Sequence, residues 1–353
     1  MPAPLPISVA LATYNGARFL PGQLESLVRQ TTTPCELVVV DDASTDETPR
    51  LLAAFAERAP FPVRLTQNGE RRGYRMTFVA AAARCAGELI AFCDQDDVWE
   101  PQKLERMAEA FEDPEVLLAH HDATLIDADD RELGSLRTAT RGAWDVVPGF
   151  SQMFRRRLLA FSPLQPLSVD HLWAIAAARD PPAAADSRIR IQAHDQFYLF
   201  WADALGKTAH VGEALVRYRQ HPGALFGRPP HPLLFALARA PELAAGRADA
   251  VGGQVALIEA AEPLCDTAEA GRLGALLADR RAALPALQRR AEIYQREGIL
   301  GRLCGVAKLT ASGGYAGGSP AASGLLDLAT DLAAAIPLGL FYRKGRFAGL
   351  LHA

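Results

Sequence analysis

Three carboxylates follow directly on a short apolar run in ELIAFCDQDDVW, the segment Glu88 to Trp99. The run Leu89 to Cys93 predicts a buried strand, so we expect Asp94, Asp96 and Asp97 to gather at its carboxyl end. Carboxylates that lie so close repel one another and need a counterion, and hard oxygen ligands suit Mg²⁺ or Mn²⁺ better than Zn²⁺. The segment therefore indicates either a divalent metal site that holds a diphosphate or an acidic turn before the next helix.

Strand and helix patterns alternate along the residues around this segment. Apolar runs rich in β-forming residues predict strands, and apolar residues at i, i+3, i+4 spacing predict helices. Ser44 and Glu47 form a capping-box pattern before the second helix, and Pro49 suits its first turn. Repeated strand–helix–strand units predict a doubly wound, mostly parallel sheet with right-handed crossovers. The predicted strands are 7–14, 36–40, 63–67 and 89–93, and the predicted helices are 18–30, 45–58, 76–85 and 104–111.

Polar residues stand at the end of each predicted strand. In open α/β sheets, ligands bind in the crevice beyond the carboxyl ends of the strands. We therefore predict that four separate segments converge on one crevice. These segments are 13–15, 41–42, 67–68 and 94–97.

Six segments resemble, in their order and spacing, the family 2 glycosyltransferases of the GT-A fold, in particular bacterial rhamnosyltransferase-like members. The resemblance covers roughly residues 5–227. It implies a GT-A-type catalytic domain and an inverting, metal-dependent transferase that moves a sugar from a nucleoside diphosphate, UDP or dTDP, to an acceptor hydroxyl. The matching segments are SVALATYNGARFL at 8–20, LVVVDDASTDET at 37–48, QNGERRGY at 67–74, GELIAFCDQDDVWEPQKLE at 87–105, HDQFYLFWADALG at 194–206 and VRYRQHPGALFG at 216–227.

The resemblance assigns five residues to the surroundings of the donor. Thr13 and Asp42 correspond to nucleobase contacts, and a carboxylate at a strand end can accept the N3–H of uracil or thymine. Asp41 either shapes that pocket or binds the amides at the start of the next helix. Arg72, together with Arg71, lies in a loop that passes near the donor in the family, or else at the surface.

The resemblance also assigns the metal ligands. Asp94 and Asp96 correspond to the pair that binds Mg²⁺ or Mn²⁺, with Asp96 as the direct ligand. Asp97 either caps the following helix or orients the donor sugar. His221, in YRQH, is expected near the diphosphate or the metal, with a loop position at the surface as the alternative.

Asp195 corresponds to the catalytic base, which takes the proton of the acceptor hydroxyl as that oxygen attacks the anomeric carbon. This role needs hydrogen-bond reach and partial desolvation. The alternative is a purely structural role as an N-cap, because Asp195 stands at the start of a predicted helix with apolar positions from Phe197 to Trp201.

The sequence His120-His121-Asp122 is a weaker candidate for a metal site than the acidic segment after residue 93. Adjacent residues in a strand point to opposite faces, so both imidazoles rarely bind one ion. We predict that these residues lie in a strand that borders the sheet. In relatives this region closes over the donor sugar, which implies a contact from Asp122.

Composition is that of a globular enzyme. The chain has 353 residues, 49% hydrophobic and 22% charged, with a formal net charge of −4. The absence of a basic stripe disfavours nucleic-acid binding. The five cysteines show no zinc or disulfide spacing and predict reduced, buried thiols, and the start of the chain shows no signal-peptide pattern. We therefore expect a cytoplasmic protein.

Beyond residue 227 the composition shifts to Ala, Leu, Arg and Glu, which predicts a helical appendage over 228–310. Residues 311–353 predict a flexible connector and an amphipathic end segment with three basic residues. That segment either contacts the inner face of the cell membrane peripherally or packs against protein. The catalytic domain is accordingly expected to span 1–227.

Taken together, these features predict a glycosyltransferase that acts on a saccharide or lipid-linked saccharide acceptor in bacterial surface polysaccharide synthesis. A sugar-nucleotidyltransferase is one alternative, but it needs a basic phosphate loop near the N-terminus, where only Arg18 is available. A catalytically inactive sugar-nucleotide-binding protein is the other. Four retained carboxylates, Asp42, Asp94, Asp96 and Asp195, disfavour it.

Overall fold

The computed structural model forms two compact units, which are described separately. The first unit comprises residues 1–141, 145–163 and 193–225, and the second comprises 142–144, 164–192 and 226–353. Within the chain, the structure describes residues 5–139, 146–173, 190–221, 239–296, 299–312, 314, 328 and 331–332.

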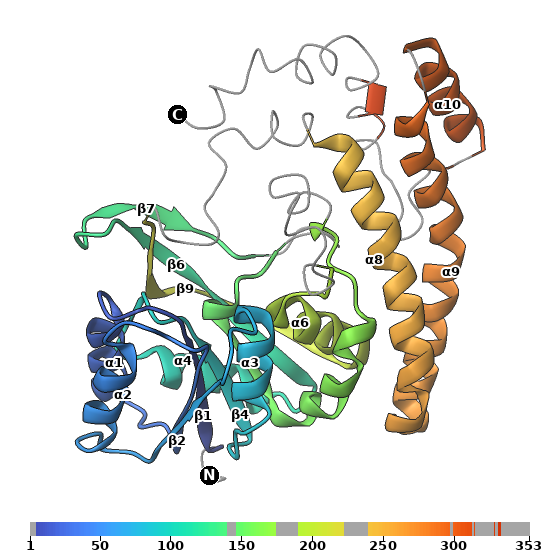
Figure 1. The fold of residues 1–353 in the computed structure, drawn as a ribbon. Helices are drawn as coiled ribbons and strands as arrows, with labels where there is room; N and C mark the ends of the chain where they lie inside the picture. The colour runs from blue at the N-terminus through green and yellow to red at the C-terminus, as the bar shows by residue number, and fades with distance from the viewer. Residues whose placement is uncertain are drawn as a thin grey trace. The chain divides into compact units, whose positions relative to one another are not determined.

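The first unit is built on a parallel sheet core (Figure 1). Its first four strands have the order β3-β2-β1-β4 and all run parallel. Apart from β3, these strands are buried along their whole length, as their continuous apolar runs predict. The strand predictions are therefore confirmed. The bounds are β1 (Ile7–Thr13), β2 (Glu36–Asp41), β3 (Val63–Gln67) and β4 (Leu89–Cys93).

Five further strands extend this sheet. They are β5 (Val98–Trp99), β6 (Val116–Ile126), β7 (Glu132–Leu136), β8 (Gln152–Arg155) and β9 (Lys207–Arg219). β8 pairs antiparallel with both β4 and β6, β9 pairs parallel with β6 and antiparallel with β5, and β7 pairs antiparallel with β6. β6 lies between β8 and β9, so the prediction that His120 and His121 belong to a bordering strand is wrong. The sheet is mixed but mostly parallel, which confirms the predicted fold class.

Helices cover both faces of the sheet (Figure 1). Val9 and Ala91 face the cluster that includes Leu24 of the first helix. Phe92, one position further along β4, points the other way and contacts Phe78 of the third helix at 5.5 Å between ring centroids. The helices of this unit are α1 (Leu20–Val28), α2 (Thr48–Ala56), α3 (Tyr74–Ala82), α4 (Lys103–Glu109) and α6 (His194–Leu205). Short 3₁₀ segments are η1 (Ala110–Glu112), η2 (Gly149–Ser151) and η3 (Arg156–Leu167).

The start of α2 differs from the prediction. Its N-cap is Glu47, which makes no side-chain capping bond, and Ser44 instead donates its hydroxyl to Oδ1 of Asp41 at 2.5 Å. The capping-box prediction is therefore wrong, because α2 begins beyond the reach of Ser44, whose hydroxyl oxygen instead accepts from the amide of Asn15 at 2.9 Å. Pro49 does lie in the first turn, as expected.

The second unit is helical in its described part, with α8 (Ala240–Ala261), α9 (Thr267–Gln295) and α10 (Ile299–Ala311), and the 3₁₀ segment η6 (Glu262–Leu264). Asp266 and Glu269 form a capping box at the start of α9. Arg290 of α9 donates to both oxygens of Asp331, at 2.7 and 2.9 Å, and both residues are buried. The predicted end segment lies almost entirely outside the described residues, and the predicted domain limits stay a prediction.

All five cysteines are free, but they are not all buried. Cys85 and Cys93 are buried, and burial raises the pKa of the Cys85 thiol to about 12. Cys35, just before β2, and Cys304, within α10, are exposed, so the prediction of buried thiols is wrong for these two. Among the described residues, no helix is both long and apolar enough to cross a membrane.

Candidate functional site

The carboxyl ends of the parallel strands bring the predicted residues to one edge of the sheet. Thr13 is level with Asp41 across the β1–β2 pair, and Asp41 is level with Gln67 across the β2–β3 pair. Gln95 joins the loop after β4 to the loop after β1, because its side chain accepts from the amide of Tyr14 at 2.9 Å and donates to the carbonyl of Tyr14 at 3.0 Å. The predicted convergence of loops is therefore present.

Asp41 is buried, and each of its carboxylate oxygens accepts two hydrogen bonds. Oδ1 accepts from the hydroxyls of Thr13 and Ser44, at 2.8 and 2.5 Å. Oδ2 accepts from the amide of Ser44 at 2.9 Å and from the side chain of Gln67 at 3.1 Å. A carboxylate has about four acceptor positions, so all of them are used within the protein. Asp41 therefore shapes the crevice by tying three strand ends together, and it does not bind the amides of α2.

Asp42 holds the loop between β3 and α3. Its Oδ1 accepts from the side chain of Asn68 at 2.9 Å and from the amide of Arg72 at 2.7 Å, and its Oδ2 accepts from the amide of Gly73 at 2.7 Å. Gly73 has φ of 84°, a conformation that favours glycine. These three bonds leave one acceptor position on the buried Asp42 within the described structure. A nucleobase N–H group could donate to this remaining acceptor position.

The arginines of this loop reach outward. The side chain of Arg72 is exposed, and the bond of this residue to Asp42 comes from the backbone amide. The guanidinium of Arg71 lies 4.1 Å from the ring centroid of Tyr14, a cation–π contact. Tyr14 and Arg71 thus join the loops on either side of the crevice. The role of Arg72 toward a donor stays a prediction.

The acidic segment after β4 is electrostatically strained. Burial, together with the negative charges of Asp96 and Asp195, raises the pKa of Asp94 to about 8. Burial also raises the pKa of Asp97, again with help from Asp96 and Asp94. Asp97 is 1% exposed, and within the described residues its Oδ2 has no hydrogen-bond partner. Such a cluster favours a cation, because positive charge relieves both the repulsion and the desolvation.

Asp96 lies beside His221, as the sequence predicts. The Nε2 atom of His221 is 3.0 Å from Oδ2 of Asp96, and the imidazole is 4.9 Å from the ring of Phe19. The His221 side chain is 15% exposed, which does not fit a surface loop position. Asp97 does not cap α4, whose N-cap is Gln102. These positions fit an ion held by Asp96 with His221 close to it, and the role of each residue stays a prediction.

Mg²⁺ and Mn²⁺ fit this set of donors. In phosphate-binding sites such ions are held by one or two carboxylates together with substrate phosphates, rather than by a cage of protein ligands. Among the described residues, no three histidine, cysteine, aspartate or glutamate side chains already form a metal cage. Asp94 and Asp96 would therefore hold the ion together with diphosphate oxygens, and Asp97 supplies an unsatisfied oxygen behind them.

Two buried cations beneath this cluster are not predicted from the sequence. Lys103 is 1% exposed, donates to the carbonyl of Phe150 at 2.6 Å and lies 3.6 Å from the ring centroid of Trp99. Burial lowers its pKa to about 7, while Asp97 and Cys93 oppose that shift. Arg219, at the end of β9, contacts the same acidic segment. Their signal in the sequence is weak: each is a basic residue within an apolar pattern.

Asp195 lies within the first turn of α6 and not at its N-cap, which is Ala193. The N-cap alternative is therefore wrong. Oδ2 of Asp195 accepts from the backbone amide of Gly149 at 3.1 Å, and its carbonyl accepts from Gln152 at 3.3 Å. The side chain of Gln196 in turn donates to the carbonyl of Val147 at 3.1 Å. The loop before β8 thus holds the first turn of α6, and it is a part of the site that sequence patterns do not predict.

His194, just before Asp195, lies among aromatic rings. It stacks on Phe78 at 4.0 Å and meets Phe92 edge-on at 4.5 Å between centroids. Burial, together with the positive charge of Arg75, lowers its pKa to about 3. Within the described part of the chain, neither ring nitrogen has a hydrogen-bond partner. The ring is therefore a neutral packing group that fixes the start of α6.

The histidines of β6 have separate partners, as the strand alternation predicts. Nδ1 of His120 is 2.8 Å from the hydroxyl of Thr138, and Nδ1 of His121 is 2.6 Å from the carbonyl of Asp122. Asp122 accepts from the amide of Thr138 at 2.8 Å and is 2.7 Å from Nε2 of His210. Burial alone would raise the pKa of Asp122, but these two bonds lower it. Its contact with a donor sugar stays a prediction.

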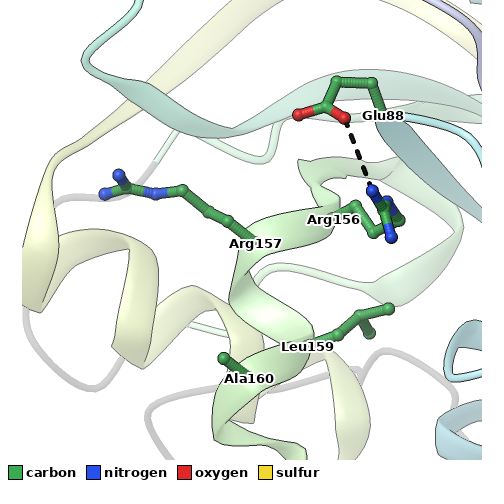
Figure 2. A pocket seen from close by; sticks show the side chains of 5 residues that line it. All are labelled: Glu88, Arg156, Arg157, Leu159 and Ala160. Atoms are coloured by element: carbon green, nitrogen blue, oxygen red, sulfur yellow. Dashed lines mark ion pairs between the residues drawn. The ribbon is translucent and has the colours of Figure 1, made fainter. Parts of the chain in front are cut away.

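A surface hollow of about 390 Å³ lies elsewhere (Figure 2). Its lining includes Glu88, just before the first residue of β4, and Arg156, whose guanidinium is 3.9 Å from that carboxylate. The remaining lining residues are Arg157, Leu159 and Ala160. The amino end of β4 is opposite the edge that carries Asp94, so this hollow is separate from the candidate site.

Comparison with known proteins gives three kinds of match. Residues 8–169 match glycosyl transferase family 2. An uncharacterised glycosyltransferase of Nostoc sp. is 30% identical over 233 residues, which are 61% of this chain and 65% of the relative. The succinoglycan biosynthesis protein ExoO of Rhizobium meliloti is 32% identical over 127 residues, 36% of each chain. The matched region thus spans less than two thirds of either relative.

Solved structures of S. aureus TarS, residues 1–349, are similar to this chain. The TM-score is 0.51 at 15% identity, with 97% of this chain and 92% of that chain covered. The structure in complex with UDP-GlcNAc has a TM-score of 0.50 at 16% identity, over the same shares. At this identity the likeness shows a shared fold, which confirms the predicted GT-A-type architecture.

Proposed function

Residues 8–169 match glycosyl transferase family 2, and from this match we propose that the protein is an inverting, metal-dependent glycosyltransferase. It moves a sugar from a nucleoside diphosphate to the hydroxyl of a saccharide or lipid-linked saccharide acceptor. A role in bacterial surface polysaccharide synthesis is supported by the similarity to a succinoglycan biosynthesis protein.

The observation that carries this proposal is the meeting of carboxylates from distant segments. The charges of Asp96 and Asp195 both act on Asp94, although Asp195 is about a hundred residues away in the chain. A metal-bound diphosphate at Asp94 and Asp96 would thus lie next to a carboxylate suited to proton transfer. A sugar-binding protein without catalysis has no need of that third carboxylate.

The proposed reaction uses these groups in turn. The carboxylate of Asp195 takes the proton of the acceptor hydroxyl as the hydroxyl oxygen attacks the anomeric carbon. The bond from that carbon to the diphosphate oxygen breaks on the opposite side, so the configuration inverts. The amide of Gly149 donates to Asp195 and so favours its ionised form before the transfer. Asp94 and Asp96 would hold a divalent ion, which when bound would stabilise the negative charge of the leaving diphosphate.

The nucleotide of the proposed donor is UDP or dTDP. Asp42 keeps one acceptor position, which suits the N3–H that uracil and thymine share. The UDP-GlcNAc complex of the similarly folded TarS supports a uridine donor. The transferred sugar is proposed only as a hexose or deoxyhexose, such as rhamnose.

A thermal-shift panel of UDP- and dTDP-sugars, with and without Mn²⁺, tests this function. A donor at about 100 times its dissociation constant is expected to stabilise the fold by about 2.7 kcal/mol. Stabilising donors are then incubated with the protein, and release of the nucleoside diphosphate is measured. Stabilisation by nucleoside triphosphates alone would favour a nucleotidyltransferase, and donor binding without release in the presence of candidate acceptors would favour an inactive binding protein.

A further inference from the structure

The side chain of Arg219 joins two loops that are far apart in the sequence. Arg219 is 4% exposed and is the last residue of β9, beside β6 and at the point where β6 turns into β7 (Figure 1). One loop is the acidic segment after β4, and the other is the turn 127–131 between β6 and β7. A buried guanidinium is costly unless its donors are satisfied, so its partners indicate what it is for.

Arg219 makes two bonds to the acidic segment. Its Nε donates to the carbonyl of Asp96 at 2.7 Å, and its backbone amide donates to Oδ1 of Asp97 at 2.9 Å. The side chain therefore fixes the backbone of Asp96, while the main chain fixes the carboxylate of Asp97. The guanidinium also lies 4.7 Å from the ring of Phe19, which is the ring that His221 contacts.

Arg219 makes two more bonds to the β6–β7 turn. Nη1 donates to the carbonyl of Asp127 at 3.0 Å, and Nη2 donates to Oδ1 of Asp130 at 2.7 Å. Asp130 has φ of 65°, and the turn is closed by the side chain of Asp127, which accepts from the amides of Asp129 and Arg131. The turn therefore holds two acceptors in place for Arg219, the carbonyl of Asp127 and the carboxylate of Asp130.

The geometry requires arginine rather than any cation. Three atoms of one planar guanidinium reach three acceptors in different directions, which the single ammonium of lysine cannot do. Arg217 provides a natural comparison two residues earlier. It donates to the carbonyl of the same Asp130 at 2.8 Å, but it is only partly buried, and among the described residues it makes no bond to Asp96 or Asp97.

We propose that Arg219 is a positioning residue that sets the affinity of the site for its divalent ion, by fixing Asp96 and Asp97 against the β6–β7 turn. The inference rests on the proposed metal-dependent function. It adds that the turn, and Asp130 within it, is part of the metal site although no atom of the turn would touch the ion. Outer-shell partners of metal ligands typically change metal affinity by about 10–100-fold when they are replaced.

The test measures Mn²⁺ binding by electron paramagnetic resonance, in the full chain with UDP present. Arg219→Lys is expected to weaken Mn²⁺ binding by about tenfold or more. UDP affinity in EDTA should stay close to the parent, because Arg219 does not touch the nucleotide crevice. Arg217→Lys is the matched control and should bind Mn²⁺ within about twofold of the parent.

A second variant keeps the inference testable when Arg219→Lys does not fold. Asp130 has a side chain that is 57% exposed, so Asp130→Ala should fold, and it removes one bond of Arg219 without approaching the ion. It is expected to weaken Mn²⁺ binding by about threefold, a smaller effect than those of direct outer-shell partners.

Mn²⁺ binding by Asp96→Asn and by the parent protein distinguishes failure of this inference from failure of the proposed function on which it rests. Loss of Mn²⁺ binding in Asp96→Asn, together with parental binding in both Arg219→Lys and Asp130→Ala, overturns the role of Arg219 and leaves the metal site intact. A parent that binds no Mn²⁺ overturns the metal-dependent function, and this inference with it.

Discussion

The backbone amide of Gly149 donates to Oδ2 of Asp195 at 3.1 Å, and only glycine fits at that position. A β-carbon on Gly149 would lie 2.6 Å from Nε2 of His194 and 3.5 Å from the β-carbon of Asp195. His194 cannot move aside easily, because Phe78 and Phe92 enclose its ring. The close approach of the two backbones therefore places a hydrogen-bond donor on the proposed catalytic carboxylate.

Gly149→Ala should slow sugar transfer with little change in donor affinity. The added methyl group pushes the loop away from α6 and lengthens the bond to Asp195. We expect turnover to fall by about tenfold, which corresponds to the loss of about one hydrogen bond to a charged group. Steady-state kinetics and calorimetry with UDP check the two quantities separately.

Gly22→Ala is the matched control for this variant. Gly22 lies in α1, where an added β-carbon meets only the side chain of Val98, at 4.0 Å. It should leave turnover unchanged. In an Asp195→Asn background, Gly149→Ala should cause no further loss of turnover. If Gly149→Ala lowers turnover equally with Asp195 present and with Asp195 replaced, the loop acts on a group other than Asp195.

Asp195→Asn should abolish most of the transfer activity while preserving the fold. Asparagine keeps the volume and one acceptor for the amide of Gly149, but it cannot take a proton. A general base contributes on the order of 10²–10⁴-fold, so we expect turnover to fall by at least about a hundredfold. Melting temperature and UDP affinity are the controls, and near-parental transfer would remove Asp195 from the reaction.

Affinity for Mn²⁺ should rise with pH. The pKa of Asp94 is raised to about 8, so below that pH the carboxyl group holds a proton that the metal must displace. We expect affinity to increase by up to tenfold per pH unit between about pH 6 and pH 8, with about one proton released per ion near pH 7. Calorimetry in buffers of different ionisation enthalpy counts that proton, and an affinity that stays flat over this range contradicts the role of Asp94.

Asp42→Ala should weaken binding of uridine and thymidine diphosphates alike. The variant removes the remaining acceptor position and also the bonds that hold Asn68, Arg72 and Gly73. We expect a loss of roughly 1–3 kcal/mol in nucleotide affinity together with a lower melting temperature. Asn68→Ala is the control, because it loosens the same loop while keeping the carboxylate; equal losses in both variants would assign the effect to the loop rather than to base recognition.

The contribution of His194 to the free energy of unfolding should fall as the solution becomes more acid. Its pKa is lowered to about 3, while the unfolded chain binds the proton near the ordinary value of 6.5. The unfolded state therefore binds more protons below pH 6.5, and the contribution of His194 is fully present above that pH and is lost as the pH falls. Each such group contributes at most about 1.4 kcal/mol per pH unit.

His194→Phe should reduce this acid sensitivity. Phenylalanine fills a similar space between Phe78 and Phe92 and takes up no proton. Urea unfolding at about pH 7 and pH 5 should show a smaller difference in the free energy of unfolding than in the parent. An unchanged difference would mean that the other buried histidines, His120 and His121, account for it.

The parallel core could be predicted because each of its features is local. Leu89 to Cys93 is an apolar run of strand length, and its predicted ends agree with the structure. The polar residues at the strand ends follow from the same bounds, so Asp42, Asp94 and Asp96 could be identified in advance. Asp195 needed the family resemblance, since nothing near it in the sequence distinguishes a base from a cap.

The parts that could not be predicted depend on partners distant in the chain. Ser44 has a suitable pattern for a capping box, but α2 begins only at Thr48, and Ser44 lies next to the end of β2, where its amide and hydroxyl donate to Asp41. Lys103 and Arg219 look like ordinary surface cations in a sequence, and only the sheet order shows that they lie under the acidic segment. Gly149 has no sequence signal at all, because its requirement comes from the ring of His194.

The saturated carboxylate of Asp41 has a consequence for the thermodynamics of donor binding. Because its four bonds tie the ends of β1, β2 and β3 to one another, the wall of the crevice is ordered before any nucleotide arrives. Little backbone entropy is then lost when a nucleobase enters. The favourable free energy of its contacts is therefore not offset by the entropy cost of ordering these loops. Association of a nucleotide with this wall should accordingly be fast and free of a slow conformational phase.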